Sequence, residues 1–322
     1  QKKRMNITVQ VVSKVALSKD IFAFELSTNT EAPLPSYEAG AHIDLYLKNG
    51  EVRQYSLYEQ FSQNANYKIA VQKEPEGRGG SVELCDALQV GDELSISPPR
   101  NHFELERGWV HYILLAGGIG ITPILAMADT LYANGSSFEL HYCVRSEERA
   151  AFRSILEEKP YTKHIFIHLD NGPAKQLLNF EELFGQVKEE HQIYMCGPEG
   201  FMRAIEKATK HWPGGNVKKE YFSAPTAKAG GSNGAFTVRL AKSGKIIEVG
   251  EDESIVEALK KAGHIAQTSC SEGLCGSCIT PVINGSPIHN DHFLTDKEKE
   301  AGLQIALCVS RALPGTEITL DL

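Results

Sequence analysis

The stretch TSCSEGLCGSCIT, residues 268–280, places three of the chain's seven cysteines within nine residues, among glycines and serines. Cys270, Cys275 and Cys278 are spaced C-x4-C-x2-C, and Cys308 follows in the apolar segment LQIALCVS. This spacing, with a remote fourth cysteine, is the pattern of plant-type [2Fe–2S] ligation. We therefore predict that these four cysteines hold a [2Fe–2S] cluster.

The cysteine loop has to meet a specific physical demand. Two irons bridged by sulfides need four thiolates from a backbone that wraps closely around them and bonds to the sulfurs through its amides. Gly273, Gly276 and Ser277 leave room for this wrapping. A zinc site or a disulfide pair is the alternative, but zinc knuckles usually combine two C-x2–4-C pairs. The lone fourth cysteine favours iron.

Length and composition restrict the class of protein. At 322 residues the chain exceeds the roughly 250 residues at which a single core stops growing, so several domains are expected. A net charge of −8 argues against binding to nucleic acids or anionic membranes. No apolar run reaches the ~18 residues of a membrane span, and residues 1–12 lack a signal peptide's hydrophobic segment. An odd number of cysteines suits thiols and metal ligands in a reducing compartment. We expect a cytoplasmic, monomeric protein.

The sequence pattern divides the chain into modules. Residues 1–106 contain short alternating runs separated by turns, which predict an antiparallel β-barrel or sandwich. In residues 107–223, continuous apolar strands alternate with helical stretches, which predicts an α/β domain with a parallel sheet. Residues 224–235, APTAKAGGSNGA, have the composition of a linker. Residues 236–322 begin with a hairpin-like pair and a helix from Ser254, its N-cap, to Ala262.

Two motifs in the α/β domain follow apolar strands. The segment GGIGITP, residues 117–123, joins a strand to a helix, where unpaired amides favour a pyrophosphate, although a purely structural turn is the alternative. Cys196, Gly197 and Pro198 end another strand at the sheet edge where α/β proteins bind ligands. Read alone, the cysteine would be a buried residue before a turn.

Polar residues after two further strands bear on the choice of nucleotide. Arg145 and Ser146 follow one strand and Asp170 follows another. A carboxylate near the ribose 2′-hydroxyl favours NADH, whereas an arginine there would accept the 2′-phosphate of NADPH. The residues themselves leave this choice open.

The barrel module contains two short candidate motifs. Strand alternation puts Arg53 and Tyr55 on one face and Ser56 on the other. The segment EGRGGS, residues 76–81, is a glycine-rich loop whose amides and arginine suit an anion, with a surface turn as the alternative. Near the end of the second module, Phe222 in KEYFSAPT is either a cofactor contact or a core or interface aromatic.

Together these motifs carry a family resemblance. The third module resembles a plant-type ferredoxin of β-grasp fold, GGIGITP and CGP resemble the nucleotide motifs of the ferredoxin–NADP⁺ reductase superfamily, and R-x-Y-S resembles its flavin signature. In this order, the whole chain resembles the phthalate dioxygenase reductase family, the reductase components of Rieske oxygenases. The resemblance implies FMN rather than FAD, NADH, a [2Fe–2S] cluster, and a terminal Rieske-type oxygenase as the partner.

The resemblance also implies roles for single residues. Arg53 would contact the flavin phosphate, Tyr55 would pack on the isoalloxazine, and Ser56 would bond near its N5. Ser56, Cys196 and Phe222 would form the catalytic set, with Phe222 against the other flavin face. The remaining FMN contacts would be Lys73, Arg78, Gly79, Gly80 and Ser81. The NADH contacts would be Gly117, Gly118, Gly120, Thr122, Pro123, Arg145, Ser146, Asp170, Cys196, Gly197 and Pro198.

The three cofactors explain one another, because NADH gives up two electrons as a hydride while a [2Fe–2S] cluster accepts one, and a flavin converts between them. We therefore expect electrons to pass from NADH through FMN and the cluster to the oxygenase. One alternative is an FAD-containing reductase of a diiron hydroxylase or a hybrid-cluster protein. A non-redox, zinc-stabilised nucleotide-binding protein is the other.

Overall fold

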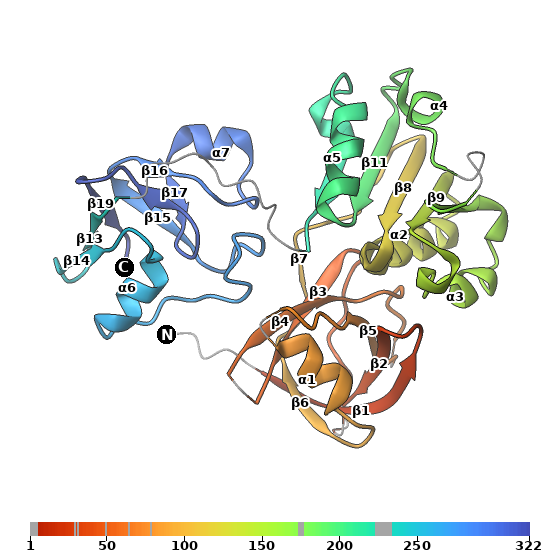
Figure 1. Ribbon diagram of the computed structural model, residues 1–322, viewed down its shortest axis with the longest axis horizontal. Helices are drawn as coiled ribbons and strands as arrows, with labels where there is room; N and C mark the ends of the chain where they lie inside the picture. The colour runs from red at the N-terminus through yellow and green to blue at the C-terminus, as the bar shows by residue number, and fades with distance from the viewer. Residues whose placement is uncertain are drawn as a thin grey trace. The chain divides into compact units, whose positions relative to one another are not determined.

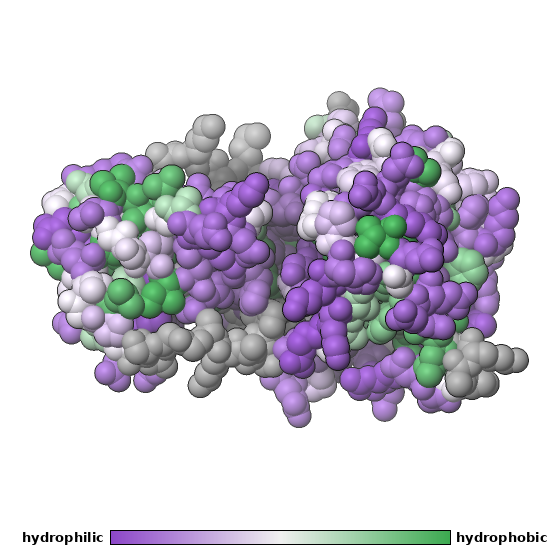
Figure 2. Space-filling view, turned by 90° about the horizontal axis from the view of Figure 1, so that it is seen from above, coloured by the Kyte–Doolittle hydropathy of each residue, from purple (hydrophilic) through white to green (hydrophobic). Residues whose placement is uncertain are grey.

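The computed structural model describes residues 6–28, 30, 32–48, 50–63, 65–77, 79–172, 177–222 and 234–322 (Figure 1). The chain forms two compact units, residues 1–222 and 223–322. Arg78 and residues 224–233 of the expected linker lie outside the described residues. Within the described ranges, no helix has the length and apolar character needed to cross a membrane. On the face seen in Figure 2, hydrophobic residues form small separate patches among hydrophilic ones.

The first part of unit 1 is an antiparallel barrel. Its elements are β1 (Ile7–Ala16), β2 (Ile21–Ser27), β3 (Ala41–Tyr46), β4 (Val52–Ser56), β5 (Tyr67–Gln72), α1 (Gly80–Asp86), β6 (Glu93–Ile96) and β7 (Arg100–Asn101). The strand order is β4-β3-β6-β1-β2-β5, with β7 beside β3. Tyr58 N, just after β4, donates to Lys68 O of β5 at 3.1 Å and joins the two ends of the sheet. This hydrogen bond between the ends of the sheet confirms the predicted barrel. A closed barrel leaves fewer unpaired strand edges than an open sheet.

The second part of unit 1 is a parallel α/β sheet. Its strands are β8 (His111–Gly117), β9 (Phe138–Val144), β10 (Ile165–Leu169), β11 (His191–Cys196) and β12 (Val217–Glu220). Its α-helices are α2 (Ile121–Ala133), α3 (Arg153–Glu157), α4 (Phe180–Phe184) and α5 (Glu199–Ala208). Short 3₁₀ helices are η1 (Gly118–Gly120), η2 (Glu147–Arg149), η3 (Thr162–His164) and η5 (Gly214–Asn216).

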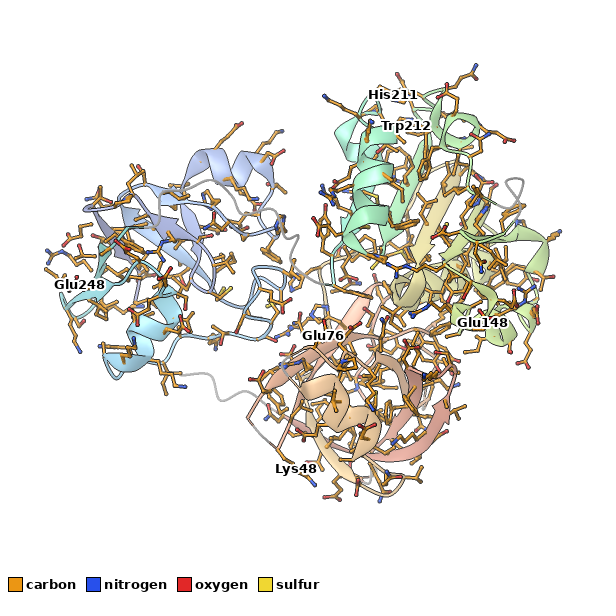
Figure 3. All side chains as sticks on the ribbon, viewed as in Figure 1. Lys48, Glu76, Glu148, His211, Trp212 and Glu248 are labelled. Carbon is orange, nitrogen blue, oxygen red and sulfur yellow. The ribbon has the colours of Figure 1, made fainter. Side chains whose placement is uncertain are left out.

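The order of this sheet, β10-β9-β8-β11-β12, changes direction between β8 and β11. Continuous apolar strands are buried on both faces, with α2 and α3 on one face and α4 and α5 on the other. After α5, His211 Nε2 and Trp212 Nε1 both lie 2.9 Å from Phe184 O and hold α4 beside α5 (Figure 3). The reversal puts the ends of β8 and β11 side by side, which is where open α/β sheets bind ligands.

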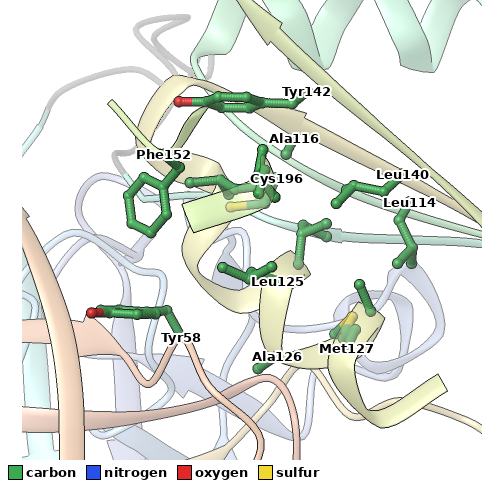
Figure 4. Close-up of a cluster of buried hydrophobic side chains, with 14 of the residues drawn as sticks. Tyr58, Leu114, Ala116, Leu125, Ala126, Met127, Leu140, Tyr142, Phe152 and Cys196 are labelled. Carbon is green, nitrogen blue, oxygen red and sulfur yellow. The ribbon is translucent and has the colours of Figure 1, made fainter. Parts of the chain in front are cut away.

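An apolar junction joins the barrel to the parallel sheet. Tyr58 packs edge-to-face on Phe152 at 5.5 Å between ring centroids, and both lie in one buried cluster with Leu125 and Cys196 (Figure 4). Tyr194 Oη donates to Glu104 O at 3.0 Å. Because the two parts share one core, the motifs on the barrel and on the sheet belong to one body.

Unit 2 is a small α+β module. Its elements are β13 (Phe236–Leu240), β14 (Ile246–Val249), α6 (Ile255–Lys261), β15 (Ile279–Asn284), β16 (Pro287–Ile288), α7 (Asp296–Ala301), β17 (Gln304–Ala306), β18 (Arg311–Ala312) and β19 (Glu317–Leu320). The mixed sheet has the order β14-β13-β19-β15-β17, and α6 packs into its core. Ser254 caps α6 in a capping box with Glu257, and Ala262 is its C-cap. The predicted β-grasp module and the bounds of its helix are confirmed.

Candidate functional site

Arg53 on β4 lies against the first residue of α1. A Cβ placed on Gly80 would meet Arg53 Nε at 2.7 Å and Leu47 Cδ1 at 2.9 Å, so a side chain at this position would displace Arg53 and Leu47. Arg53 Nη1 bonds to Glu51 Oε2 at 2.5 Å, whereas Nη2 is buried without a hydrogen-bond partner in the described part of the chain. A buried guanidinium nitrogen with no partner is costly, which favours an anion here. The two barrel motifs therefore meet at one place.

Tyr55 and Ser56 lie on opposite faces of β4, as alternation predicts. Tyr55 pairs with Ile43 in the β3–β4 register and packs on the barrel core, and its burial raises the pKa of its hydroxyl. Ser56 is buried and pairs with His42, whose pKa is lowered to about 4 by burial and by Arg100. The hydroxyl of Ser56 thus belongs to a buried polar face of the barrel.

The two predicted nucleotide motifs pack against each other where β8 and β11 end. A Cβ on Gly120 would lie 2.2 Å from the carbonyl oxygen of Cys196. One on Gly117 would lie 2.8 Å from Pro198 Cδ, and one on Gly197 would lie 3.0 Å from Gly117 Cα. The glycines thus bring two loops close enough for a ligand to contact both.

Glu220, the last residue of β12, is a further candidate that the sequence reasoning missed. It pairs with Cys196 in the β11–β12 register. Its Oε2 atom is buried and has no hydrogen-bond partner in the described ranges, although the residue as a whole is partly exposed. Burial raises its pKa to about 8, and burial together with Glu220 raises the pKa of the Cys196 thiol. Burial therefore favours the neutral form of both groups. The feature of the sequence that could have identified Glu220 is its position at the carboxyl end of a parallel strand.

The other predicted contacts fall into two groups. Some already have partners: Thr122 Oγ1 donates to Ile119 O, Lys73 bonds to Asp86, and Ser81 Oγ accepts from Glu74 N. Arg145 and Asp170 are exposed where β9 and β10 end, with Ser146 partly exposed beside them. Phe222 is 39% exposed, so it is not a core aromatic. Pro123 is buried in α2, and Gly79 is the N-cap of α1 with a φ of 87°.

In unit 2 the four cysteines form two pairs. Cys278 Sγ lies 3.2 Å from Cys308 Sγ. Cys270 donates to Cys275 Sγ through its backbone N–H at 3.5 Å and also through its thiol, and these bonds lower the pKa of the Cys275 thiol. No group of three or more His, Cys, Asp or Glu in the described part is arranged to hold one metal ion. Two pairs of thiols suit two irons better than one tetrahedral zinc.

The loop around these sulfurs has the winding that a cluster requires. Ser271, Gly273 and Gly276 have left-handed φ angles of 58°, 72° and 68°. The backbone amides of Glu272 and Leu274 donate to Cys270 Sγ at 3.3 and 3.4 Å. Amides directed at sulfur stabilise bound thiolates, so the residues present fit a [2Fe–2S] cluster.

Three family models match the chain, one over each of the regions that contain these residues. Residues 8–105 match the family described as an oxidoreductase FAD-binding domain, and residues 114–207 match an oxidoreductase NAD-binding domain. Residues 238–313 match a 2Fe-2S iron-sulfur cluster binding domain. The chain is an NAD-linked flavin iron–sulfur oxidoreductase.

Full-length relatives narrow this class. The chain is 42% identical to vanillate O-demethylase oxidoreductase of Pseudomonas sp. (strain HR199 / DSM 7063), covering 95% of this chain and 97% of that one. It is 40% identical to phthalate dioxygenase reductase of Burkholderia cepacia, covering 98% and 97%. This chain belongs to the phthalate dioxygenase reductase family, the reductase components of Rieske-type oxygenases.

Solved structures give the same result. A structure of phthalate dioxygenase reductase matches with a TM-score of 0.75 and 40% identity over 99% of this chain and 98% of that chain. An intact type IV self-sufficient cytochrome P450 monooxygenase matches with a TM-score of 0.88 and 35% identity. This match covers 99% of this chain but only 41% of the P450 chain.

Proposed function

We propose that this chain carries electrons from NADH through FMN and a [2Fe–2S] cluster, one at a time, to the Rieske centre of a terminal aromatic-ring oxygenase. The proposal assigns residues 1–106 to FMN, 107–223 to NADH and 236–322 to the cluster, with 224–235 as the linker. It also holds that the protein is monomeric and that it lies in the cytoplasm. When bound, a flavin accepts a hydride from NADH and passes electrons on singly. The observation that carries the proposal is the presence of three fitting sites in one chain.

For the flavin, the key contact is that of Arg53 with Gly80. The unpartnered Nη2 atom of Arg53 and the first turn of α1 provide donors for one phosphate group. FMN ends at that phosphate, whereas FAD continues into a second one. The assignment to FMN follows from the family resemblance, by which Lys73, Arg78, Gly79, Gly80 and Ser81 would contact the phosphate. Mass measurement of the released flavin tests this assignment.

Replacing Arg53 with alanine is expected to weaken flavin binding about 10- to 100-fold, since a hydrogen bond to a charged group contributes about 1.5–3 kcal/mol. Flavin per chain after gel filtration and the Kd for added FMN measure this effect. Arg203→Ala, on the exposed face of α5, is the matched control and should retain its flavin. An unchanged Kd in Arg53→Ala would exclude the phosphate role.

For the nucleotide, the paired glycine loops would receive the pyrophosphate, and Arg145, Ser146 and Asp170 would contact the adenosine ribose. A bond from the 2′-hydroxyl to Asp170 would favour NADH, whereas a 2′-phosphate on Arg145 would favour NADPH, and the family resemblance decides the proposal for NADH. Ser56, Cys196 and Phe222 would orient the nicotinamide against the flavin. The neutral Cys196 thiol and the neutral Glu220 carboxyl would let the uncharged ring enter without opposing charges.

The raised pKa of Glu220 predicts a pH-dependent stability. Because the folded pKa, about 8, exceeds the usual 4.5, this group stabilises the fold fully below about pH 4.5 and the contribution is lost as pH rises through 8. Glu220→Gln should therefore melt at nearly the wild-type temperature at pH 5 but at a higher temperature at pH 9. The expected difference is a few kcal/mol, at about 1.4 kcal/mol per pKa unit.

Flavin-release melting curves between pH 5 and 9 measure this difference. Glu189→Gln, at an exposed position before β11, is the control and should follow the wild type at every pH. Parallel pH profiles for wild type and Glu220→Gln would mean that Glu220 ionises normally in the fold.

A further inference from the structure

Asp291 is the most deeply buried carboxylate of unit 2 among the described residues, with no exposed side-chain surface. Its Oδ2 atom accepts a hydrogen bond from Leu294 N at 2.8 Å. Its Oδ1 atom accepts one from Ser310 Oγ at 3.2 Å and lies 3.5 Å from His289 Nδ1. A buried carboxylate held by several donors is expensive to remove from water, so its retention calls for a reason.

The segment around Asp291, residues 289–294, contacts both cysteine-bearing segments. On the loop side, His292 N donates to Gly273 O at 3.0 Å, and a Cβ on Gly273 would lie 3.1 Å from Asp291 Cα. On the Cys308 side, Asn290 Nδ2 donates to Val309 O at 3.0 Å, and Asn290 N donates to Ser310 Oγ at 3.1 Å. Ser310 thus links Asp291 to the turn after β17 that supplies the fourth cysteine.

The same segment covers the loop at a second point. A Cβ on Gly276, between Cys275 and Cys278, would lie 2.3 Å from the ring of Phe293. Lys299 Nζ, from α7, donates to Asp291 O at 2.6 Å and fixes the backbone of the segment from the other side. Asp291 is therefore the buried centre of a clamp between residues 273–276 and residues 309–310.

We propose that Asp291 is a positioning residue for the cluster, which fixes the two ligand segments relative to each other and lowers the reduction potential of the cluster. This inference rests on the proposed set of four cysteine ligands. Reduction adds an electron to an already negative centre, and a nearby carboxylate in a low-dielectric surrounding opposes that addition. The donors to the carboxylate, Leu294 N and Ser310 Oγ, spread its charge and moderate this effect.

The experiment is a redox titration of the intact, cofactor-loaded protein, followed by the electron-spin signal of the reduced cluster. Asp291→Asn keeps the shape and removes the charge, so it should favour the reduced cluster about tenfold, equal to about 59 mV for a one-electron couple. Ser310→Ala should shift the potential in the opposite direction, because the carboxylate then keeps more of its charge. Asp252→Asn, an exposed change in the same unit, should leave the potential unchanged.

The outcomes are separable. If the equilibrium constant for reduction of the cluster in Asp291→Asn lies within about twofold of the wild-type value, the proposal is overturned. Shifts of the same sign in both variants would also overturn it, since general loosening of the loop would then be the cause. If Asp291→Asn does not retain its cluster, the sign of the shift in Ser310→Ala decides. A wild-type protein without a cluster would instead refute the ligand set and the proposed function.

Discussion

Replacing Cys275 with serine is expected to remove the cluster while NADH still reduces the flavin at close to the wild-type rate. Cys275 forms one of the two thiol pairs, with Cys270, and a cysteine binds iron as its thiolate. A serine hydroxyl stays protonated and binds iron weakly. The flavin and nucleotide sites lie in the other unit and have their own cores, so the substitution should not disturb them.

The size of the effect should be large. Electron delivery to a one-electron protein acceptor should fall by about 100-fold or more, because losing a ligand exceeds the 10- to 100-fold effects of outer-shell changes. Iron and sulfide content, the electron-spin signal and the stopped-flow rate of flavin reduction measure the separate steps. Cys143→Ser, a thiol of unit 1, is the matched control and should keep full iron content. Normal delivery by Cys275→Ser would refute the ligand assignment.

The second large effect is expected from Gly120→Ala. The added Cβ would lie 2.2 Å from the carbonyl oxygen of Cys196 and 2.5 Å from its carbon, and backbone atoms cannot move aside cheaply. The two nucleotide loops would separate, at an overpacking cost of about 1–3 kcal/mol. NADH binding should therefore weaken by up to about 100-fold, at about 1.4 kcal/mol per tenfold.

Steady-state KM and the Kd for NADH check this expectation, with bound flavin as a test of folding. Gly200→Ala is the matched control, because nothing lies within 4 Å of the Cβ it would add. It should bind NADH normally and be slightly more stable, since α5 gains helix propensity. A Gly120→Ala protein with wild-type NADH affinity would show that the contact of the two loops does not form the nucleotide site.

Local patterns predicted much of the fold. Strand alternation, the alternation of apolar strands with helices, and the N-cap signal at Ser254 all depend on residues close in sequence, and the structure confirms the elements they predict. The cysteine spacing was equally local, since three of the four cysteines lie on one loop. These local signals were sufficient to predict the three modules and to recognise the family.

Long-range contacts in the sites could not be predicted in this way. The approach of Arg53 to Gly80 depends on how α1 returns to β4, and the pairing of Glu220 with Cys196 depends on the strand order of the sheet. Division of the cysteines into two pairs requires Cys308 to approach Cys278 across 30 residues of chain. Such contacts are set by packing, for which one sequence gives no direct signal.

The most direct test of the central claim is an anaerobic titration of the purified protein with NADH. Flavin and iron–sulfur absorbance are followed together with the cluster's electron-spin signal. The mass of the released flavin is measured by mass spectrometry. The account predicts FMN, uptake of about three electrons per chain, two at the flavin and one at the cluster, and a reduced [2Fe–2S] signal. A colourless protein, or one that holds zinc in place of iron, would contradict it.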